Sequence, residues 1–495
     1  MSARAKLAGI GIAVGSFLLL VYRYWFPPEK IFDEVYFARA AEEYLQRRYI
    51  YENTHPPVTK LLITLSTVLF GGLQHGDTSV GWRFLDVVAG AVAVWLVFVL
   101  ARRVTKSTLY ASYAAGLFAL DGMHFVQSRI ATPESFVVCF SLATLYTFCR
   151  YWDALVARSD RRLPLPLVRL LLGGTGAVLL AIVAVALRFP NETRPAQIVA
   201  GVIIAAALYV IYRVWVRPPA GGLWLALFAL SGGLLVASKW YGVMAYGVVF
   251  TVVVSATIYA IVKHRRPAFP VDLVATAIVA GVGIVYALAY IPHFIGLRDL
   301  QTLAPRPYTL SDVVTMQVNA YLYHAHLHAT HPYSSVWWQW PFDLRPVLYY
   351  ATYGRNGNAV NTAAIITSLA NPIVLWLGLV TVPAVAVLAV VRRDRAYALV
   401  VLTYLAQWLP WMASPRLAFA YHFYVDIPLI CICTAVAMQF LYEWMHEWDR
   451  NAARTIVIGY FGIAAAWFVY CYPILSGMTI PYASWMQRMW LHSWI

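Results

Sequence analysis

Long apolar runs separated by short polar segments dominate this 495-residue sequence. A helix needs roughly 20 apolar residues to cross the hydrocarbon core of a membrane. Runs close to this length recur along the chain and predict an all-α integral membrane protein with about 11–13 transmembrane helices. The predicted spans are about 7–25, 84–101, 108–121, 132–150, 168–187, 196–215, 221–237, 242–262, 271–291, 368–391, 396–411, 425–443 and 455–474.

Charged residues are few and unevenly placed. The chain has 37 Lys and Arg against 22 Asp and Glu, a formal net charge of +15, whereas 61% of its residues are hydrophobic. If the N-terminus is cytoplasmic, the basic clusters all fall on the cytoplasmic side, as the positive-inside rule expects. The charge therefore indicates orientation in the lipid bilayer, and no nucleic-acid partner is expected. The clusters are Arg4/Lys6, Arg102/Arg103/Lys106, Arg158/Arg161/Arg162, Arg213/Arg217, Lys263/Arg265/Arg266, Arg392/Arg393/Arg395 and Arg450/Arg454.

Spans and loops together divide the chain into three parts. Residues 1–291 form an N-terminal transmembrane module with a first outer loop at 26–83, residues 292–367 a large outer loop rich in aromatic residues and histidine, and residues 368–495 a C-terminal four-helix region. All five cysteines fall in predicted spans. We therefore expect buried thiols, without a disulfide framework or a zinc site.

The first outer loop carries an acidic pair and a proline-rich turn. From Asp33 and Glu34 to about Arg48 the apolar positions follow a helical stripe, which predicts an amphipathic helix on the membrane surface. Because carboxylates are favoured at a helix N-terminus, ordinary capping is an alternative to a catalytic role for the pair. His55, followed by two prolines, predicts an extended turn back toward the membrane.

The second outer element is a tight turn between two predicted spans, and it contains Asp121, Gln127, Arg129 and Glu134. A cation so close to the hydrocarbon is usually paired or functional. The alternatives are a structural pair of Arg129 with Glu134 or Asp121, and binding of an anionic ligand.

Two other outer boundaries carry basic residues among aromatic ones. Lys239 precedes Trp240, and a lysine that snorkels toward the headgroups is the alternative to a ligand-binding role. The last outer segment holds Arg416, Tyr421 and His422 at the start of a span.

The large outer loop contains a histidine cluster and a Trp/Tyr-rich stretch. His324 and His328 would share a helix face, and His331 could join them, but no carboxylate completes a standard metal site. Tyr333 and Trp340 belong to an aromatic stretch suited to the membrane interface or to stacking on a ligand.

These outer acids and cations suggest one kind of chemistry. Arg and Lys bind phosphate oxygens well, so the cations could hold a lipid phosphate at the interface. A carboxylate could act as general base toward a hydroxyl acceptor. A phosphate leaving group needs little protonation, because its second pKa is about 6. One base and a set of cations would therefore suffice.

These segments, taken in their order along the chain, resemble motifs of the protein O-mannosyltransferases. These are polytopic GT-C glycosyltransferases that use a polyprenyl-phosphate-linked sugar. The acidic pair followed by the His-Pro-Pro element is the most specific part of the resemblance. The pieces are Phe32-Asp33-Glu34-Val35, His55-Pro56-Pro57-Val58-Thr59-Lys60-Leu61-Leu62, Asp121 with Gln127-Ser128-Arg129 and Glu134, Ser238-Lys239-Trp240, His331 to Ser335 with Trp338 to Pro341, and Arg416 with Tyr421-His422-Phe423-Tyr424.

The resemblance implies an inverting transfer of mannose, or a related hexose, from the lipid carrier to Ser or Thr of a secreted or membrane protein on the periplasmic or extracellular face. No metal or other cofactor is required, although a divalent cation near Asp33 or the histidines is an open alternative. The implied roles are a base for Asp33 and acceptor positioning for Glu34, donor-phosphate binding by Arg129, Lys239, Arg416 and His422, and support by His55, Asp121, Gln127, Glu134, Trp240, His331, Tyr333, Trp340 and Tyr421.

The sequence departs from the family pattern in places. Members usually have eleven spans, and the extra two would be the hairpin at about 168–215. The large outer loop is too short for the β-trefoil domain of the eukaryotic enzymes, which points to a prokaryotic source. Glu134 stands where many members have Asp.

Two rival functions differ in acceptor or in class. A relative that glycosylates a lipid headgroup, like the aminoarabinose transferases, would need the same donor site. A transporter or flippase would place charges near the bilayer midplane, whereas the polar residues here gather at one face.

Overall fold

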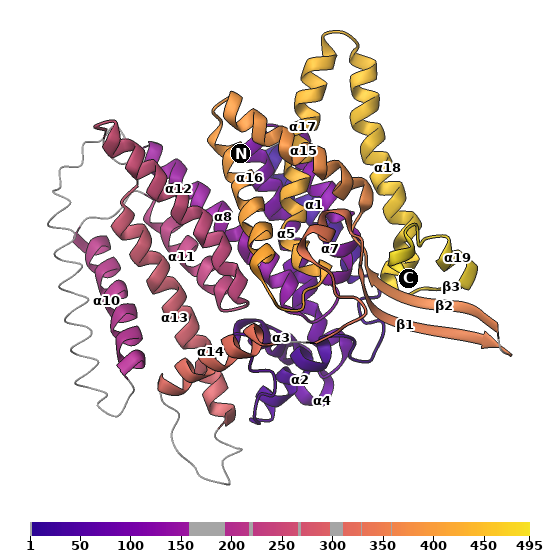
Figure 1. Ribbon diagram of the computed structural model, residues 1–495, viewed down its shortest axis with the longest axis horizontal. Helices are drawn as coiled ribbons and strands as arrows, with labels where there is room; N and C mark the ends of the chain where they lie inside the picture. The colour runs from indigo at the N-terminus through magenta and orange to yellow at the C-terminus, as the bar shows by residue number, and fades with distance from the viewer. Residues whose placement is uncertain are drawn as a thin grey trace. The chain divides into compact units, whose positions relative to one another are not determined.

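The computed structural model describes residues 2–157, 194–216, 221–265, 269–297, 310–327, 329–357 and 359–495. They form two compact units, and each is described by itself. The first unit comprises Met1–Glu42, Leu62–Leu142 and Leu327–Ile495, and the second comprises Glu43–Leu61 and Ala143–His326. Both units are mainly helical, so the predicted helical membrane architecture is confirmed (Figure 1).

Nine helices in the described residues are long and apolar enough to cross a membrane. Each matches a predicted span, although the ends differ by several residues. The candidate spans are Ala3–Val21, Ser79–Thr105, Arg194–Arg213, Trp240–Val262, Val271–His293, Pro372–Val391, Arg395–Ala413, Ile427–His446 and Arg450–Ser476.

Four other predicted spans have different outcomes. Helices α6 (Thr108–Ala119) and α11 (Gly222–Val236) are present with 12 and 15 residues, shorter than the usual membrane-crossing length. Helix α8 (Pro133–Ala157) has 25 residues and carries several charged side chains. The span at 168–187 lies outside the described residues, as does the basic cluster at 158–162.

Capped helices make up most of the first unit. The side chains of Asn371, Asp394 and Asp449 accept hydrogen bonds from the first-turn amides of α15, α16 and α18. Helices α17 and α18 run side by side as a hairpin (Figure 1). The helix bounds are α1 Ala3–Val21, α4 Gly72–His75, α5 Ser79–Thr105, α7 Gly122–Gln127, α15 Pro372–Val391, α16 Arg395–Trp408, α17 Ile427–His446, α18 Arg450–Ser476 and α19 Tyr482–Met486.

A three-stranded antiparallel sheet also belongs to this unit, and the sequence pattern did not predict it. Strands β1 (Val347–Asn356) and β2 (Ala359–Ser368) form a hairpin, and β3 (Thr479–Pro481) pairs with β2 (Figure 1). The strand order is β1-β2-β3, so β1 lies at an edge. The buried halves of both strands pack into a hydrophobic core with α7 and α18.

The second unit is built mainly from α11 and α13, with α10 against α13. Arg213 of α10 forms an ion pair with Asp272 of α13 at 2.6 Å. The five cysteines of the two units are buried free thiols, as predicted. The remaining helices are α10 Arg194–Val216, α12 Val243–Val262, α13 Val271–Leu297 and α14 Leu310–Ala325, while α2 Glu34–Leu45, α3 Val58–Leu69 and α8 contribute residues to both units.

Candidate active site

Asp33 is the last residue of an irregular segment and directly precedes α2, which begins at Glu34. Its backbone carbonyl accepts hydrogen bonds from the amides of Tyr36 (2.9 Å) and Phe37 (3.1 Å), which starts the helix. The helix predicted from about Asp33 is therefore present. The preceding Phe32 has a left-handed φ of 48°, a conformation that a bulky residue keeps only when its surroundings hold it. The Asp33 side chain is half-buried.

Glu34, the next residue, is completely buried in an ion pair with Arg83. Arg83 Nε donates to Glu34 Oε1 and Arg83 Nη2 donates to Oε2, each over 2.6 Å, so the pair is bidentate. The backbone amides of Ala131 (2.8 Å) and Ile31 (3.1 Å) donate to the same carboxylate. Both Glu34 oxygens are thus occupied by protein groups, which favours a positioning role over acceptor binding.

Arg83 ties the segment before α2 to α5. Its Nη1 donates to the carbonyl oxygens of Tyr24 (3.1 Å) and Pro27 (2.8 Å), and its Nη2 donates to that of Glu29 (3.2 Å). The ion pair therefore fixes the backbone that carries Asp33. Sequence reasoning missed Arg83, although an arginine at the start of an apolar span was an available signal.

Aromatic rings surround the residue before Asp33. The Phe32 ring centroid lies 4.5 Å from that of Tyr349, 6.0 Å from Tyr421 and 6.5 Å from His331. Gln127 Nε2 donates a 2.6 Å hydrogen bond to the Tyr349 hydroxyl. Three predicted site residues, Gln127, His331 and Tyr421, thus meet beside the acidic pair.

Nearby charges shift the pKa of two buried tyrosines, Tyr349 and Tyr421. Burial raises the pKa of Tyr349 well above its ordinary value, and the negative charges of Glu134 and Asp33 raise it further. Burial and the same two carboxylates also raise the pKa of Tyr421, whereas the Arg416 guanidinium lowers it. The charges of Asp33, Glu134 and Arg416 therefore all act on the Tyr421 hydroxyl.

Arg129 is nearly buried beside the end of α1. Its Nη2 donates to the carbonyl oxygen of Tyr22 (3.0 Å), and its guanidinium lies 4.4 Å from the Phe125 ring centroid. Its Nε has no hydrogen-bond partner in the part of the chain that the structure describes. Burial lowers the pKa of Arg129 to about 9, with a further decrease from the positive charges of Arg83 and Arg23, so it stays protonated at neutral pH.

Arg23 lies in the backbone turn whose Tyr22 carbonyl oxygen accepts the hydrogen bond from Arg129. It follows Tyr22, has a left-handed φ of 56°, and places its guanidinium 5.4 Å from the Phe26 ring centroid. Among the described residues, no carboxylate forms a salt bridge with Arg23 or Arg129. The structural pair of Arg129 with an acid, one of the two predicted alternatives, is thus not formed. Sequence reasoning missed Arg23, which falls near the end of the first predicted span at about 7–25.

Other predicted site residues of the first unit hold the fold together. Asp121 caps α7 through His124 N (2.9 Å) and accepts a hydrogen bond from Asn371 N (2.8 Å). His422 is buried, and its ring stacks on Trp340 with centroids 5.9 Å apart. Tyr333 receives the Arg345 guanidinium over its ring at 5.0 Å. These contacts give the three side chains structural roles.

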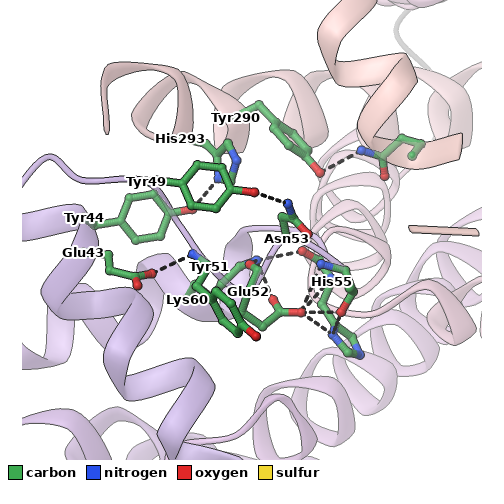
Figure 2. Close-up of polar contacts among 12 residues, drawn as sticks. Glu43, Tyr44, Tyr49, Tyr51, Glu52, Asn53, His55, Lys60, Tyr290 and His293 are labelled. Atoms are coloured by element: carbon green, nitrogen blue, oxygen red, sulfur yellow. Dashed lines mark hydrogen bonds and ion pairs between the residues drawn. The ribbon is translucent and has the colours of Figure 1, made fainter. Parts of the chain in front are cut away.

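The His-Pro-Pro turn belongs to the second unit and is organised by Glu52 (Figure 2). Lys60 is completely buried and its Nζ donates to Glu52 Oε2 (2.7 Å) and to the carbonyl oxygen of His55 (2.8 Å). His55 Nδ1 lies 2.9 Å from Glu52 Oε1. Burial by itself would raise the pKa of Glu52, but Lys60 and His55 hold it well below its ordinary value. His55 is thus oriented by a carboxylate.

Lys239 and Trp240 also lie in the second unit. Lys239 is 7% exposed and its Nζ lies 5.4 Å from the Tyr241 ring centroid. Trp240 Nε1 donates to the Tyr286 hydroxyl (2.7 Å), which in turn donates to Gln317 Oε1 (2.7 Å). The hydrogen-bonded series thereby orients the segment that carries Lys239.

The structure offers no assembled metal site within the residues it describes: no three His, Cys, Asp or Glu side chains form a group that could hold an ion. His324 ends up with its ring 5.2 Å from that of His55 and its Nε2 3.1 Å from Thr54 O. His328 lies outside the described residues.

Comparison with known proteins identifies the family of this chain. Residues 12–178 match the family model described as dolichyl-phosphate-mannose-protein mannosyltransferase. Residues 309–494 match the model of the C-terminal four-transmembrane region of protein O-mannosyltransferases. Together the two matches cover more than half of the chain. The chain belongs to the protein O-mannosyltransferase family. The resemblance found in the sequence is confirmed.

Individual relatives of this O-mannosyltransferase agree with the family models. A polyprenol-phosphate-mannose–protein mannosyltransferase of Mycolicibacterium smegmatis is 28% identical over 94% of this chain and 87% of its own length. One from Mycobacterium tuberculosis is 26% identical over 94% of this chain and 86% of its own length.

Solved structures show the same fold. A protein O-mannosyltransferase complex of S. cerevisiae, bound to the sugar donor, has a TM-score of 0.71 at 12% identity, covering 100% of this chain and 93% of the other. ArnT from Cupriavidus metallidurans, bound to undecaprenyl phosphate, has a TM-score of 0.50 at 11% identity, covering 95% and 71%. The predicted GT-C fold of this multi-pass membrane protein is thereby confirmed.

Proposed function

We propose that this membrane mannosyltransferase transfers mannose from a polyprenyl phosphate to a Ser or Thr hydroxyl of a protein on the outer face of the membrane. Asp33 is the general base of this reaction. The family and the names of the relatives support mannose transfer from a lipid carrier to protein. The observation that carries the assignment of the base is local: Asp33 is half-buried and adjoins a carboxylate, Glu34, that is wholly engaged by Arg83.

In the proposed reaction Asp33 accepts the hydroxyl proton while the hydroxyl oxygen bonds to the anomeric carbon. The bond from that carbon to the carrier phosphate oxygen breaks on the opposite side, and the phosphate departs with the bonding electrons. The anomeric configuration is therefore inverted. A general base of this kind contributes about 10²–10⁴-fold to the rate.

Arg129 is the strongest candidate for the carrier phosphate. It is a nearly buried cation with an unused Nε and no carboxylate partner in the described part of the chain, and Arg23 adds a second guanidinium at the same backbone turn. Buried cations that face a developing phosphate charge stabilise it without reorganisation. Arg416, Lys239 and His422 remain proposed contributors, and the charge of Arg416 acts on Tyr421 together with those of Asp33 and Glu134.

The proposed orientation follows from the basic clusters. With the N-terminus cytoplasmic, they lie on the cytoplasmic side, and Asp33, which directly follows the first span, lies outside. The acceptors would then be secreted or membrane proteins. Cysteine accessibility in intact cells at Tyr22 and at Arg103 would test this orientation, and labelling only at Arg103 from outside would contradict it.

The test of the base is Asp33→Asn in purified enzyme supplied with polyprenyl-phosphate mannose and a Ser-containing peptide. We expect transfer to fall at least about 10²-fold while binding of polyprenyl phosphate persists. Glu29→Gln, which neutralises an exposed acid of the same segment, is the matched control. Transfer at the wild-type rate by Asp33→Asn would refute the assignment.

A parallel assay separates the two acceptor classes. The enzyme is offered the peptide and a lipid A-type glycolipid with the same donor. Mannose on the peptide alone supports the proposal, and mannose on the lipid alone overturns it in favour of a lipid-acceptor enzyme.

A further inference from the structure

The edge of the sheet beside Asp33 is open. β1 pairs with β2 on one side, and no backbone hydrogen bond reaches its other side from any described residue. From Ala351 to Asn356 the strand is exposed. An edge strand with unpaired amides and carbonyls is a template for another strand unless it is blocked by proline, lysine, inward charges or bulges that twist it away. Between Tyr350 and Gly354, where its pairing with β2 is regular, β1 contains none of these, and its one charged residue, Arg355, lies near the tip.

A β-bulge connects this edge to the active site. Leu348 pairs with Thr367 and Tyr350 with Ile366, so Tyr349 is the extra residue on β1. Bulges of this kind redirect a side chain and increase the local twist. Here the redirected Tyr349 ring packs at 4.5 Å on Phe32, the residue before Asp33.

Aromatic contacts brace β1 from both faces of the sheet, because side chains alternate along a strand and Tyr350 and Tyr353 are three residues apart. Tyr350 contacts Phe26 edge-on with centroids 5.6 Å apart, and Tyr353 contacts Trp485 of α19 at 6.2 Å. A strand advances about 3.3 Å per residue. The exposed edge therefore begins about 7 Å along the strand from Tyr349, roughly two residues of an extended chain.

We propose that the acceptor protein binds as an extended, unfolded Ser- or Thr-containing segment that adds a strand to the free edge of β1 and continues past Tyr349 to place its hydroxyl at Asp33. Strand addition takes its affinity from main-chain hydrogen bonds and so tolerates many sequences. The occupant is argued from continuity, because the edge leads from solvent to the proposed base. The inference rests on the proposed function and specifies the form of its acceptor.

The test uses the wild-type enzyme and a peptide with one Ser, N-methylated at one amide at a time. In an added antiparallel strand, alternate amides face the edge and the others face away. We expect transfer efficiency to fall about three- to tenfold at alternate positions on one side of the Ser, with little change at the positions between. Sensitivity at no position, or equally at all positions, would overturn the inference.

Two measurements separate this inference from the proposed function. Peptide binding is followed by fluorescence anisotropy with the same N-methyl series in the presence of polyprenyl phosphate. If the parent peptide binds with the alternating pattern but receives no mannose, the proposed function fails and the edge assignment stands. If mannose is transferred without the pattern, the edge assignment fails alone.

Variants of the edge provide an independent check. Ala351→Pro and Thr352→Pro are neighbouring changes, of which one removes an amide that faces β2 and the other an amide that faces the edge. We expect one of the two to keep the wild-type Tm and donor binding yet lose peptide binding. Cross-linking of Thr352→Cys into a dimer at micromolar concentration would overturn the proposal, because a second copy would then occupy the edge.

Discussion

The Glu34–Arg83 ion pair allows a strong prediction, because both side chains are buried and together they hold the backbone that carries the proposed base. Replacing Glu34 by Gln removes the charge that balances Arg83, yet leaves the guanidinium among three carbonyl oxygens. Breaking a buried pair from one side costs about 3–5 kcal/mol. At about 1.4 kcal/mol per tenfold, the segment that carries Asp33 would detach roughly 10²- to 4 × 10³-fold more often.

We expect Glu34→Gln and Arg83→Met each to lower transfer by at least about tenfold and to lower the Tm in detergent. Replacing both members by apolar residues, Glu34→Leu with Arg83→Met, should restore much of the Tm, because no unpaired charge stays buried. The assays are mannose transfer, thermal unfolding and polyprenyl-phosphate binding, with Glu29→Gln as control. Single variants that keep the wild-type Tm and transfer rate would show that the pair does not position Asp33.

Three further predictions concern other groups. Arg23→Gln should raise the KM for the donor about tenfold with a smaller change in kcat, as expected for one lost charge-assisted hydrogen bond, and an unchanged KM would remove Arg23 from the phosphate site. The pKa of Glu52 is lowered on folding, so its stabilising effect is complete above the ordinary glutamate pKa of about 4.3 and is lost as the pH falls toward the folded value. Glu52→Gln should therefore lower the Tm at pH 7 and make the Tm less dependent on pH between about 5 and 3, whereas parallel pH profiles would contradict the role of the Lys60 pair. Tyr349→Phe removes the acceptor of the Gln127 hydrogen bond and should destabilise the protein by about 1 kcal/mol, measured from its unfolding in denaturant.

Local sequence was enough to predict the membrane helices and the class of chemistry. Apolar runs near 20 residues are visible without any long-range contact, and the nine candidate spans fall on predicted ones. Because membrane insertion separates the two ends of each span, the position of the charges along the chain predicted that the acids and cations lie on one side. The motif around Asp33 and Glu34 then carried the family, which the family models confirm.

The roles of neighbouring residues depended on tertiary structure. Asp33 and Glu34 look alike in the sequence, but only Glu34 meets Arg83, which lies 49 positions away. Arg129 could have paired with an acid in its own turn, and instead it bonds to Tyr22 O, 107 positions away. Partners so distant in sequence are chosen by helix packing, which no local pattern encodes.

The sheet is the clearest case of a feature that only the folded chain decides. β1 and β2 are rich in Tyr, Ala and Thr, a composition that also suits an aromatic interfacial loop. Their pairing buries one end of the hairpin against α7 and α18, and one extra residue at Tyr349 turns the edge strand toward Phe32. The sequence by itself determined the membrane helices, the family and the candidate acids and cations. Tertiary structure decided which acid is held by Arg83 and which strand edge lies open, because both depend on contacts between residues far apart in the chain.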